Sequence, residues 1–179
     1  GEKLRSLISD LNLTSRLEYA MQPLRLEKVY PVELARQVVC EFLDGGLEER
    51  YEIEFSADQE SEPVTIPGDE ALLKRALGNL IQNSIVHNPQ GCRISVSVLC
   101  GGTSIMVEVV DDGAGVSSEK LEELTAGGHR LESTDEKLNL RHGLGVLLVW
   151  QIMEAHKGTV TMESEPQKGF KTALAFPVS

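Results

Sequence analysis

Hydrophobic residues recur at helical spacing in four stretches of the chain, with polar residues between them. Asp69 stands at the start of the third stretch, where its side chain can accept a hydrogen bond from a backbone N–H of the first turn. Gly45 and Gly158 follow the second and fourth stretches, and glycine is typical of a helix end. We therefore predict helices over residues 2–19, 32–43, 69–87 and 144–156.

Strand patterns occur between the second, third and fourth helices and after the last one. Apolar and polar residues alternate in short runs over residues 51–55, 63–66, 93–99, 104–110, 159–163 and 170–176. The Gly101-Gly102 pair between the third and fourth runs is a strong β-hairpin signal. Residues 111–142 read as a long irregular segment, which is typical of a functional lid or of disorder. The order of elements indicates an α+β fold, with one mixed or antiparallel sheet and helices on one face.

The composition narrows the class of protein. The chain has 179 residues, 41% apolar but only 4% aromatic, which suits one compact domain with an aliphatic core and a helical appendage. A net charge of -11 argues against nucleic acid or an anionic membrane as a partner of the whole surface. The three cysteines, Cys40, Cys92 and Cys100, form no CxxC pair, which favours a reducing compartment. The longest apolar stretch, residues 143–153, is shorter than the roughly 18 residues of a membrane span.

Two asparagines on the predicted helix 69–87 are candidate ligands. Asn79 and Asn83 are four residues apart and therefore share a helix face. A side-chain amide oxygen on that face could complete a Mg²⁺ shell made otherwise of phosphate oxygens and water. Two exposed asparagines on a solvent face are the alternative interpretation, and the spacing alone does not exclude it.

An acidic, glycine-containing segment follows the strand 104–110. Asp111 ends the strand, and Gly113, Gly115 and Val116 follow it. A carboxylate there can accept a hydrogen bond from an exocyclic amine such as that of adenine, and glycines let a planar ligand come close to the backbone. A plain Asp-Gly turn remains possible, whereas a Rossmann fingerprint would need a third glycine at Ser118.

The last candidate segment opens the helix 144–156. It reads Arg141, His142, Gly143, Leu144 and Gly145. Glycines at a helix start expose backbone N–H groups at the positive end of the helix dipole, which is a favourable place for phosphate. A flexible hinge before a buried helix is an alternative that is compatible with phosphate binding.

The three segments together, in this order, resemble the catalytic and ATP-binding domain of the sensor histidine kinases of two-component systems. The resemblance covers about residues 29–179 and includes Gly169 and Thr172 near the end. Residues 1–28 resemble a linker and the remnant of the second helix of the dimerisation and histidine-phosphotransfer hairpin. The resemblance implies the Bergerat-type two-layer α/β sandwich shared with gyrase, Hsp90 and MutL, with a mixed, mostly antiparallel sheet.

The resemblance also implies roles for single residues. Asn83 would bind Mg²⁺, and Asn79 would lie beside the phosphates of ATP. Asp111 would accept the adenine amine, supported by Thr172. The remaining implied nucleotide contacts are Gly113, Gly115 and Val116 around the base, and Arg141, His142, Gly143, Leu144 and Gly145 at the phosphates.

The sequence departs from the family pattern at several places. Val86 stands where these kinases usually carry a Lys or Arg that reaches a phosphate, and Arg141 replaces the first glycine of a Gly-x-Gly-x-Gly run. We expect Arg141 or His142 to supply the missing charge, so an unchanged ATP affinity of Arg141→Ala in calorimetry would contradict us. The phenylalanine-rich lid motif is not evident, which leaves leucines as lid anchors: Leu121, Leu124 and Leu131.

The function implied is transfer of the γ-phosphoryl group of ATP to a histidine on a segment absent from this chain. The family's acceptor histidine has an acidic neighbour and a nearby proline on the hairpin, and none of His87, His129, His142 and His156 has that context. We therefore predict ATP binding without phosphorylation in cis. The implied partners are the hairpin, a response regulator and, in the full-length protein, a second copy; nucleic acid is not expected.

The same motifs are compatible with two other functions. ATPases of the gyrase and Hsp90 kind carry a Glu as base where this chain has Asn79, whose amide cannot take a proton. A nucleotide-binding pseudo-kinase or scaffold is the other alternative, suggested by Val86 and the unusual lid. The kinase reading also implies a cytoplasmic domain within a membrane-anchored full-length protein.

Overall fold

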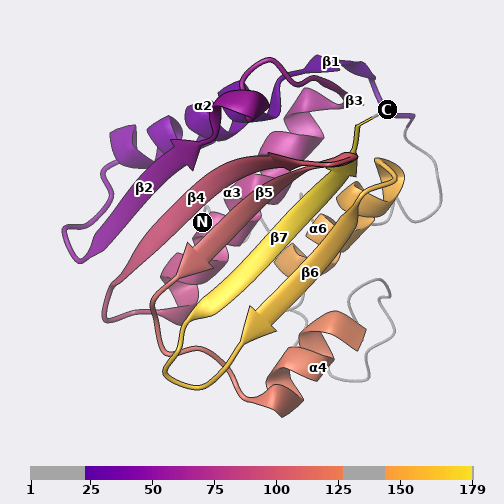
Figure 1. Ribbon diagram of the computed structural model, residues 1–179. Helices are drawn as coiled ribbons and strands as arrows, with labels where there is room; N and C mark the ends of the chain where they lie inside the picture. The colour runs from indigo at the N-terminus through magenta and orange to yellow at the C-terminus, as the bar shows by residue number, and fades with distance from the viewer. Residues whose placement is uncertain (1–22, 127–143, 179) are drawn as a thin grey trace.

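The computed structural model describes residues 23–126 and 144–178 of the chain. The main strands are β2 (Tyr51–Ala57), β4 (Cys92–Gly101), β5 (Ser104–Asp111), β6 (Thr159–Ser164) and β7 (Phe170–Pro177). They form one sheet in the order β2–β4–β5–β7–β6 (Figure 1). β2 pairs in parallel with β4, and the other neighbouring strands pair antiparallel. The predicted mixed, mostly antiparallel sheet is therefore confirmed.

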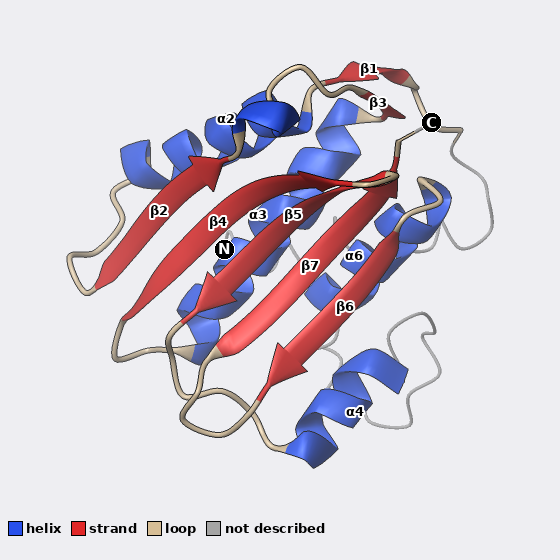
Figure 2. Ribbon diagram, in the orientation of Figure 1, coloured by secondary structure: helices blue, strands red, loops and turns tan. Residues whose placement is uncertain are grey.

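Three helices cover one face of this sheet. They are α2 (Pro31–Asp44), α3 (Glu70–His87) and α6 (Leu144–Ala155). Figure 2 shows them together behind the strands, so the domain is a two-layer α/β sandwich, as predicted. The helix predicted over residues 2–19 lies outside the described residues. None of the helices within 23–126 and 144–178 has the length and apolar character needed to cross a membrane.

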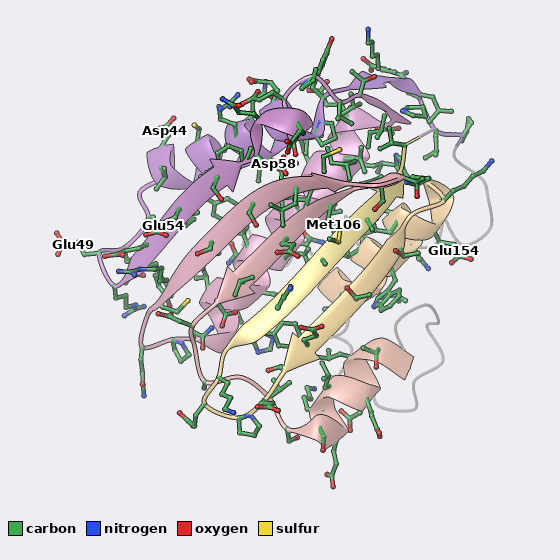
Figure 3. The ribbon with its side chains drawn as sticks, viewed as in Figure 1. Asp44, Glu49, Glu54, Asp58, Met106 and Glu154 are labelled. Carbon is green, nitrogen blue, oxygen red and sulfur yellow. The ribbon has the colours of Figure 1, made fainter. Side chains whose placement is uncertain are left out.

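Aliphatic side chains fill the space between the two layers. Every second residue of β4 is fully buried on the side that faces the helices: Ile94, Val96 and Val98. Leu148 and Ile152 of α6 are fully buried as well. The intervening residues of the strands face the other side of the sheet, where Figure 3 shows Met106 of β5. The low aromatic content of the chain is thus matched by a core of branched aliphatic residues.

The N-terminal part of the described chain forms a small second sheet that the sequence did not predict. β1 (Glu27–Val29) pairs antiparallel with β3 (Ile66–Gly68). The strand predicted over residues 63–66 was therefore placed too early. A 3₁₀ turn, Gln59–Ser61, precedes it, and the side chain of Asp58 accepts the Ser61 N–H at 3.0 Å. Strands of three residues are too short for alternation to reveal them.

A helix also lies inside the segment predicted to be irregular. α4 (Ser118–Ala126) follows the loop after β5 and packs beside the end of β6 (Figure 1). The Ser117 hydroxyl accepts the Lys120 N–H at 3.2 Å, which caps its first turn. Leu121 and Leu124, two of the expected anchors, are half-buried against the core. Leu131 lies outside the described residues.

Asp69 joins three parts of the chain. As predicted, it caps α3, because its Oδ1 accepts the Leu72 N–H at 3.3 Å. Its Oδ2 accepts the Arg25 N–H at 3.1 Å, and its own N–H donates to His156 Nε2 at 2.9 Å, at the end of α6. The side chain is 7% exposed. The carboxylate of Asp69 therefore fixes the start of the described chain to α3, and the backbone N–H of the same residue links it to the end of α6.

Candidate functional site

A cavity of about 190 Å³ lies where α3, α4 and α6 meet the ends of β5 and β7. Its walls are mostly apolar, with a few polar side chains among them, which is typical of a site for a small molecule. The described residues that line it are Leu80, Asn83, Ser84, His87, Asn88, Val109, Asp111, Gly115, Val116, Lys120, Leu124, Val146, Met162, Phe170 and Thr172.

Two buried polar residues lie in this cavity on adjacent strands. Asp111 ends β5 and is only 4% exposed, and its Oδ1 accepts the Gly113 N–H at 3.0 Å. Thr172 of β7 is 3% exposed and pairs in register with Val109 of β5. A buried carboxylate beside a hydroxyl can accept hydrogen bonds from an amine of a planar ligand. Asp111 was predicted as the acceptor of the adenine amine and Thr172 as its support, and both lie in the cavity.

The loop after Asp111 is clamped on one side by the end of α3. Asn88 donates from Nδ2 to the Ser84 carbonyl at 2.8 Å and accepts the Ala114 N–H on Oδ1 at 3.1 Å. A Cβ added at Gly113 would overlap the amide of Asn88. Gly113 therefore lets the loop lie directly against Asn88, although it is not among the described residues that line the cavity.

The turn between β6 and β7 clamps the other side of the same loop. The Val116 N–H donates to Ser164 Oγ at 2.9 Å, and Ser164 Oγ donates to the Gly169 carbonyl at 2.6 Å. Gly115 has φ +68, and a side chain there would collide with the Glu165 carbonyl. Gly115 and Val116 are thus held at the cavity wall, where the sequence predicted them.

The α3 wall holds one of the two predicted asparagines in the cavity. Asn83 is half-buried and lines it, whereas Asn79, one turn earlier, is half-buried and not among the described lining residues. Val86 is 54% exposed. The described part of the chain contains no cluster of three or more His, Cys, Asp or Glu side chains that could hold a metal ion.

The predicted phosphate segment is described only in part. Leu144 and Gly145 form the first turn of α6, and Val146 of the next position lines the cavity. Arg141, His142 and Gly143 lie outside the described residues. The start of α6 is thus at the cavity, while the predicted roles of all five residues remain predictions.

Cys92, beside the cavity, has a thiol of low reactivity. Burial raises the pKa of the Cys92 thiol to about 11, and the neighbouring carboxylates of Asp111 and Asp112 add to the rise. Its Sγ lies 3.8 Å from the Ser84 carbonyl, to which it donates a weak hydrogen bond. At neutral pH this side chain is therefore a neutral thiol rather than a nucleophile.

Sequence reasoning missed several residues of the site. Asn88 and Ser164 act through contacts across 26 and 48 positions of the chain, which no local pattern reveals. Lys120 was missed because α4 was not predicted, and Leu124 was named only as a lid anchor. Their spacing of four positions, together with a serine just before the helix, was the available signal.

Comparisons with known proteins agree with this geometry. The family model described as "Histidine kinase-, DNA gyrase B-, and HSP90-like ATPase" matches residues 68–179, more than half of the chain. The adaptive-response sensory kinase SasA of Microcystis aeruginosa is 29% identical over 176 residues, which are 98% of this chain and 45% of that protein. The chain therefore spans less than half the length of this curated relative.

Solved structures share the fold at lower identity. Full-length ShkA in complex with AMPPNP has a TM-score of 0.78 and 24% identity, over 98% of this chain and 36% of that one. Histidine kinase ThkA in complex with the response regulator protein TrrA has a TM-score of 0.73 and 20% identity, over 99% of this chain and 48% of that one. At these identities the likeness establishes the fold alone.

Proposed function

The chain belongs to the family of histidine kinase-, DNA gyrase B- and HSP90-like ATPases, and from that premise we propose that its cavity binds ATP for transfer of the γ-phosphoryl group to a histidine outside this chain. The observation that carries the proposal is a buried carboxylate, Asp111, in a mostly apolar cavity that also contains the buried Thr172 of the adjacent strand. Such a site can accept the exocyclic amine of adenine while the apolar walls cover the ring.

The residues of α3 suit the phosphate side of this ligand. Asn83 presents a half-buried amide at the cavity, and an amide oxygen fits a Mg²⁺ shell that keeps several waters and phosphate oxygens. When bound, the ion would neutralise and orient the phosphates. The chain itself would position the nucleotide, with α6 presenting its first-turn N–H groups to the phosphates.

Transfer is favoured over hydrolysis by the residue types at two positions, Asp111 in the cavity and Asn79 on α3. Asp111 is the one Asp or Glu among its described lining residues, and it ends β5 with one oxygen already bonded to the Gly113 N–H. Asn79, where the ATPases have a glutamate, cannot accept a proton from an attacking water. The nucleophile would instead be an imidazole brought by another segment.

We infer the partners from the same premise. The relative SasA is named a sensory kinase, and ThkA was solved with a response regulator protein, which supports a phosphoacceptor hairpin and a response regulator as partners of the longer protein. Dimerisation would come from the hairpin. Because ATP is a cytoplasmic metabolite, we place the domain in the cytoplasm.

The test is phosphotransfer in two parts. The chain is incubated with Mg²⁺ and ATP labelled at the γ-phosphate, with and without a separately produced hairpin that carries the acceptor histidine of the same kinase. We expect an acid-labile label on the hairpin and none on the chain alone. A chain that binds ATP but never labels the hairpin would contradict the kinase function and favour a scaffold.

A further inference from the structure

The described walls of the cavity carry little positive charge for a ligand with several phosphates. The ionisable lining residues of the cavity are Asp111, His87 and Lys120, and the other polar ones carry no charge: Asn83, Ser84, Asn88 and Thr172. Val86 of α3 is an exposed apolar side chain and offers no cation. The net charge of the whole chain is -11. A local cation is therefore needed to hold a polyanion here in addition to the metal ion.

Lys120 is the single lysine or arginine among the described residues that line the cavity. It lies on α4, one turn before Leu124, which lines the same cavity, so both occupy one helix face. Its side chain is 24% exposed, which is low for a lysine. Most of the side chain is therefore covered, and a lysine whose stem is covered in this way can still present its ammonium group to a ligand.

The position of Lys120 is fixed through the clamped loop. Its N–H donates to Ser117 Oγ at 3.2 Å, and the Val116 N–H just before donates to Ser164 Oγ at 2.9 Å. The first turn of α4 is therefore held to the β6–β7 turn, beside the end of β6 (Figure 1). The β6–β7 turn also fixes the loop that follows Asp111. The positions of Lys120 and Asp111 relative to each other are therefore set by the same turn.

Among residues 23–126 and 144–178, the ammonium group of Lys120 has one weak ion-pair partner. Lys120 Nζ lies 3.7 Å from Glu123 Oε2, and the Glu123 side chain is 56% exposed. An exposed ion pair at that distance contributes little, so the lysine can exchange Glu123 for a phosphate with small loss. A phosphate oxygen within the cavity would give a shorter, charge-assisted hydrogen bond.

We propose that Lys120 binds the phosphate groups of the nucleotide and supplies a positive charge that position 86 lacks, in addition to the charge expected from Arg141 or His142. The proposal rests on the proposed function. It makes α4, rather than α3, the element that supplies a fixed charge to the phosphates. The lysine then discriminates between adenosine and its phosphorylated forms, because adenosine offers the ammonium group no anion.

The test measures binding of adenosine, ADP and ATP by calorimetry to the wild-type chain, Lys120→Met and Lys120→Arg. We expect Lys120→Met to weaken ADP and ATP binding about tenfold, as loss of one charge-assisted hydrogen bond predicts. Adenosine binding should change less than about twofold. Lys120→Arg should recover most of the ADP affinity, and the loss in Lys120→Met should shrink at high salt.

Lys74→Met is the matched control. Lys74 Nζ also lies 3.7 Å from a glutamate, Glu70, and its side chain is 29% exposed, but it does not line the cavity. Lys74→Met should leave the affinities for adenosine, ADP and ATP unchanged. Circular dichroism confirms that each variant is folded.

Two results would overturn the proposal. One is unchanged ADP affinity in Lys120→Met, and the other is an equal loss for adenosine and ADP, which would mean that the stem packs on the base. A wild-type chain that binds neither adenosine nor ADP would overturn the proposed function as well, so the two failures are distinguishable.

Discussion

The contact between Gly113 and Asn88 gives a prediction whose size follows from the geometry. A methyl group at position 113 overlaps the Asn88 amide, so in Gly113→Ala the asparagine must leave its place. That movement breaks its bonds to the Ser84 carbonyl (2.8 Å) and the Ala114 N–H (3.1 Å). At about 1 kcal/mol for each bond, Gly113→Ala should lower the free energy of unfolding by about 2 kcal/mol.

Asn88→Ala removes the same two bonds and should cost a similar amount. Because both changes break one set of contacts, the double variant should cost about as much as either single one, roughly 2 kcal/mol rather than 4. The apparent coupling is therefore about 2 kcal/mol. Each variant should melt about 4–8 °C below the wild type, as expected for a chain of this length.

Urea unfolding followed by circular dichroism measures these free energies. Gly78→Ala serves as the control for glycine replacement, because nothing lies within 4 Å of its added Cβ in the middle of α3. It should raise stability by about 0.5–1 kcal/mol. If the loss of stability in the double variant equals the sum of the two single losses to within about 0.5 kcal/mol, the reasoning is refuted.

Three further predictions concern the metal, the thiol and the N-terminal joint. Asn83→Ala should remove most of the Mg²⁺-dependent gain in ATP affinity and leave Mg²⁺-free binding within about twofold in calorimetry; an undiminished Mg²⁺ effect would exclude Asn83 as a ligand. Because burial raises the pKa of Cys92 to about 11, its alkylation by iodoacetamide should be much slower at pH 8 than that of the exposed Cys40 and should accelerate towards pH 11, as peptide mass spectrometry can follow; equal rates at pH 8 would argue against the burial. Asp69→Ala should cost about 1–2 kcal/mol by loss of the bonds from Leu72 and Arg25, and Asp69→Asn less, in thermal unfolding; a larger loss in Asp69→Asn would show that the hydrogen bonds are not what matters.

The sequence carried enough information for the sandwich but not for its short elements. The alternation along residues 93–110 and the periodicity of residues 69–87 repeat often enough to reveal β4, β5 and α3. β1 and β3 have three residues each and exist because they pair with one another across the chain. In α4, Leu121 and Leu124 are the two leucines that pack against the core, and most other residues of the helix are polar or charged. A segment of this composition was therefore interpreted as a loop.

The residues of the site also fall into a group that the sequence predicted and a group that it did not. Asp111, Thr172 and Asn83 were identified from residue type, position on an element and family resemblance, and all three line the cavity. Asn88, Ser164 and Lys120 hold or complete the site through tertiary packing, which a single sequence does not encode locally. The position of these three residues at the cavity was therefore predictable, whereas the contacts that hold the cavity walls together were not.

The measurement closest to the central claim compares Mg-ATP and Mg-GTP binding to the wild-type chain and Asp111→Asn by calorimetry. The amide keeps an acceptor for the Gly113 N–H, so the loop should survive, but it is neutral and weakens the bond to the adenine amine. We predict that the wild type prefers ATP and that the variant loses about tenfold in ATP affinity. Equal binding of ATP and GTP by the wild type, or unchanged ATP affinity in Asp111→Asn, would contradict the adenine site.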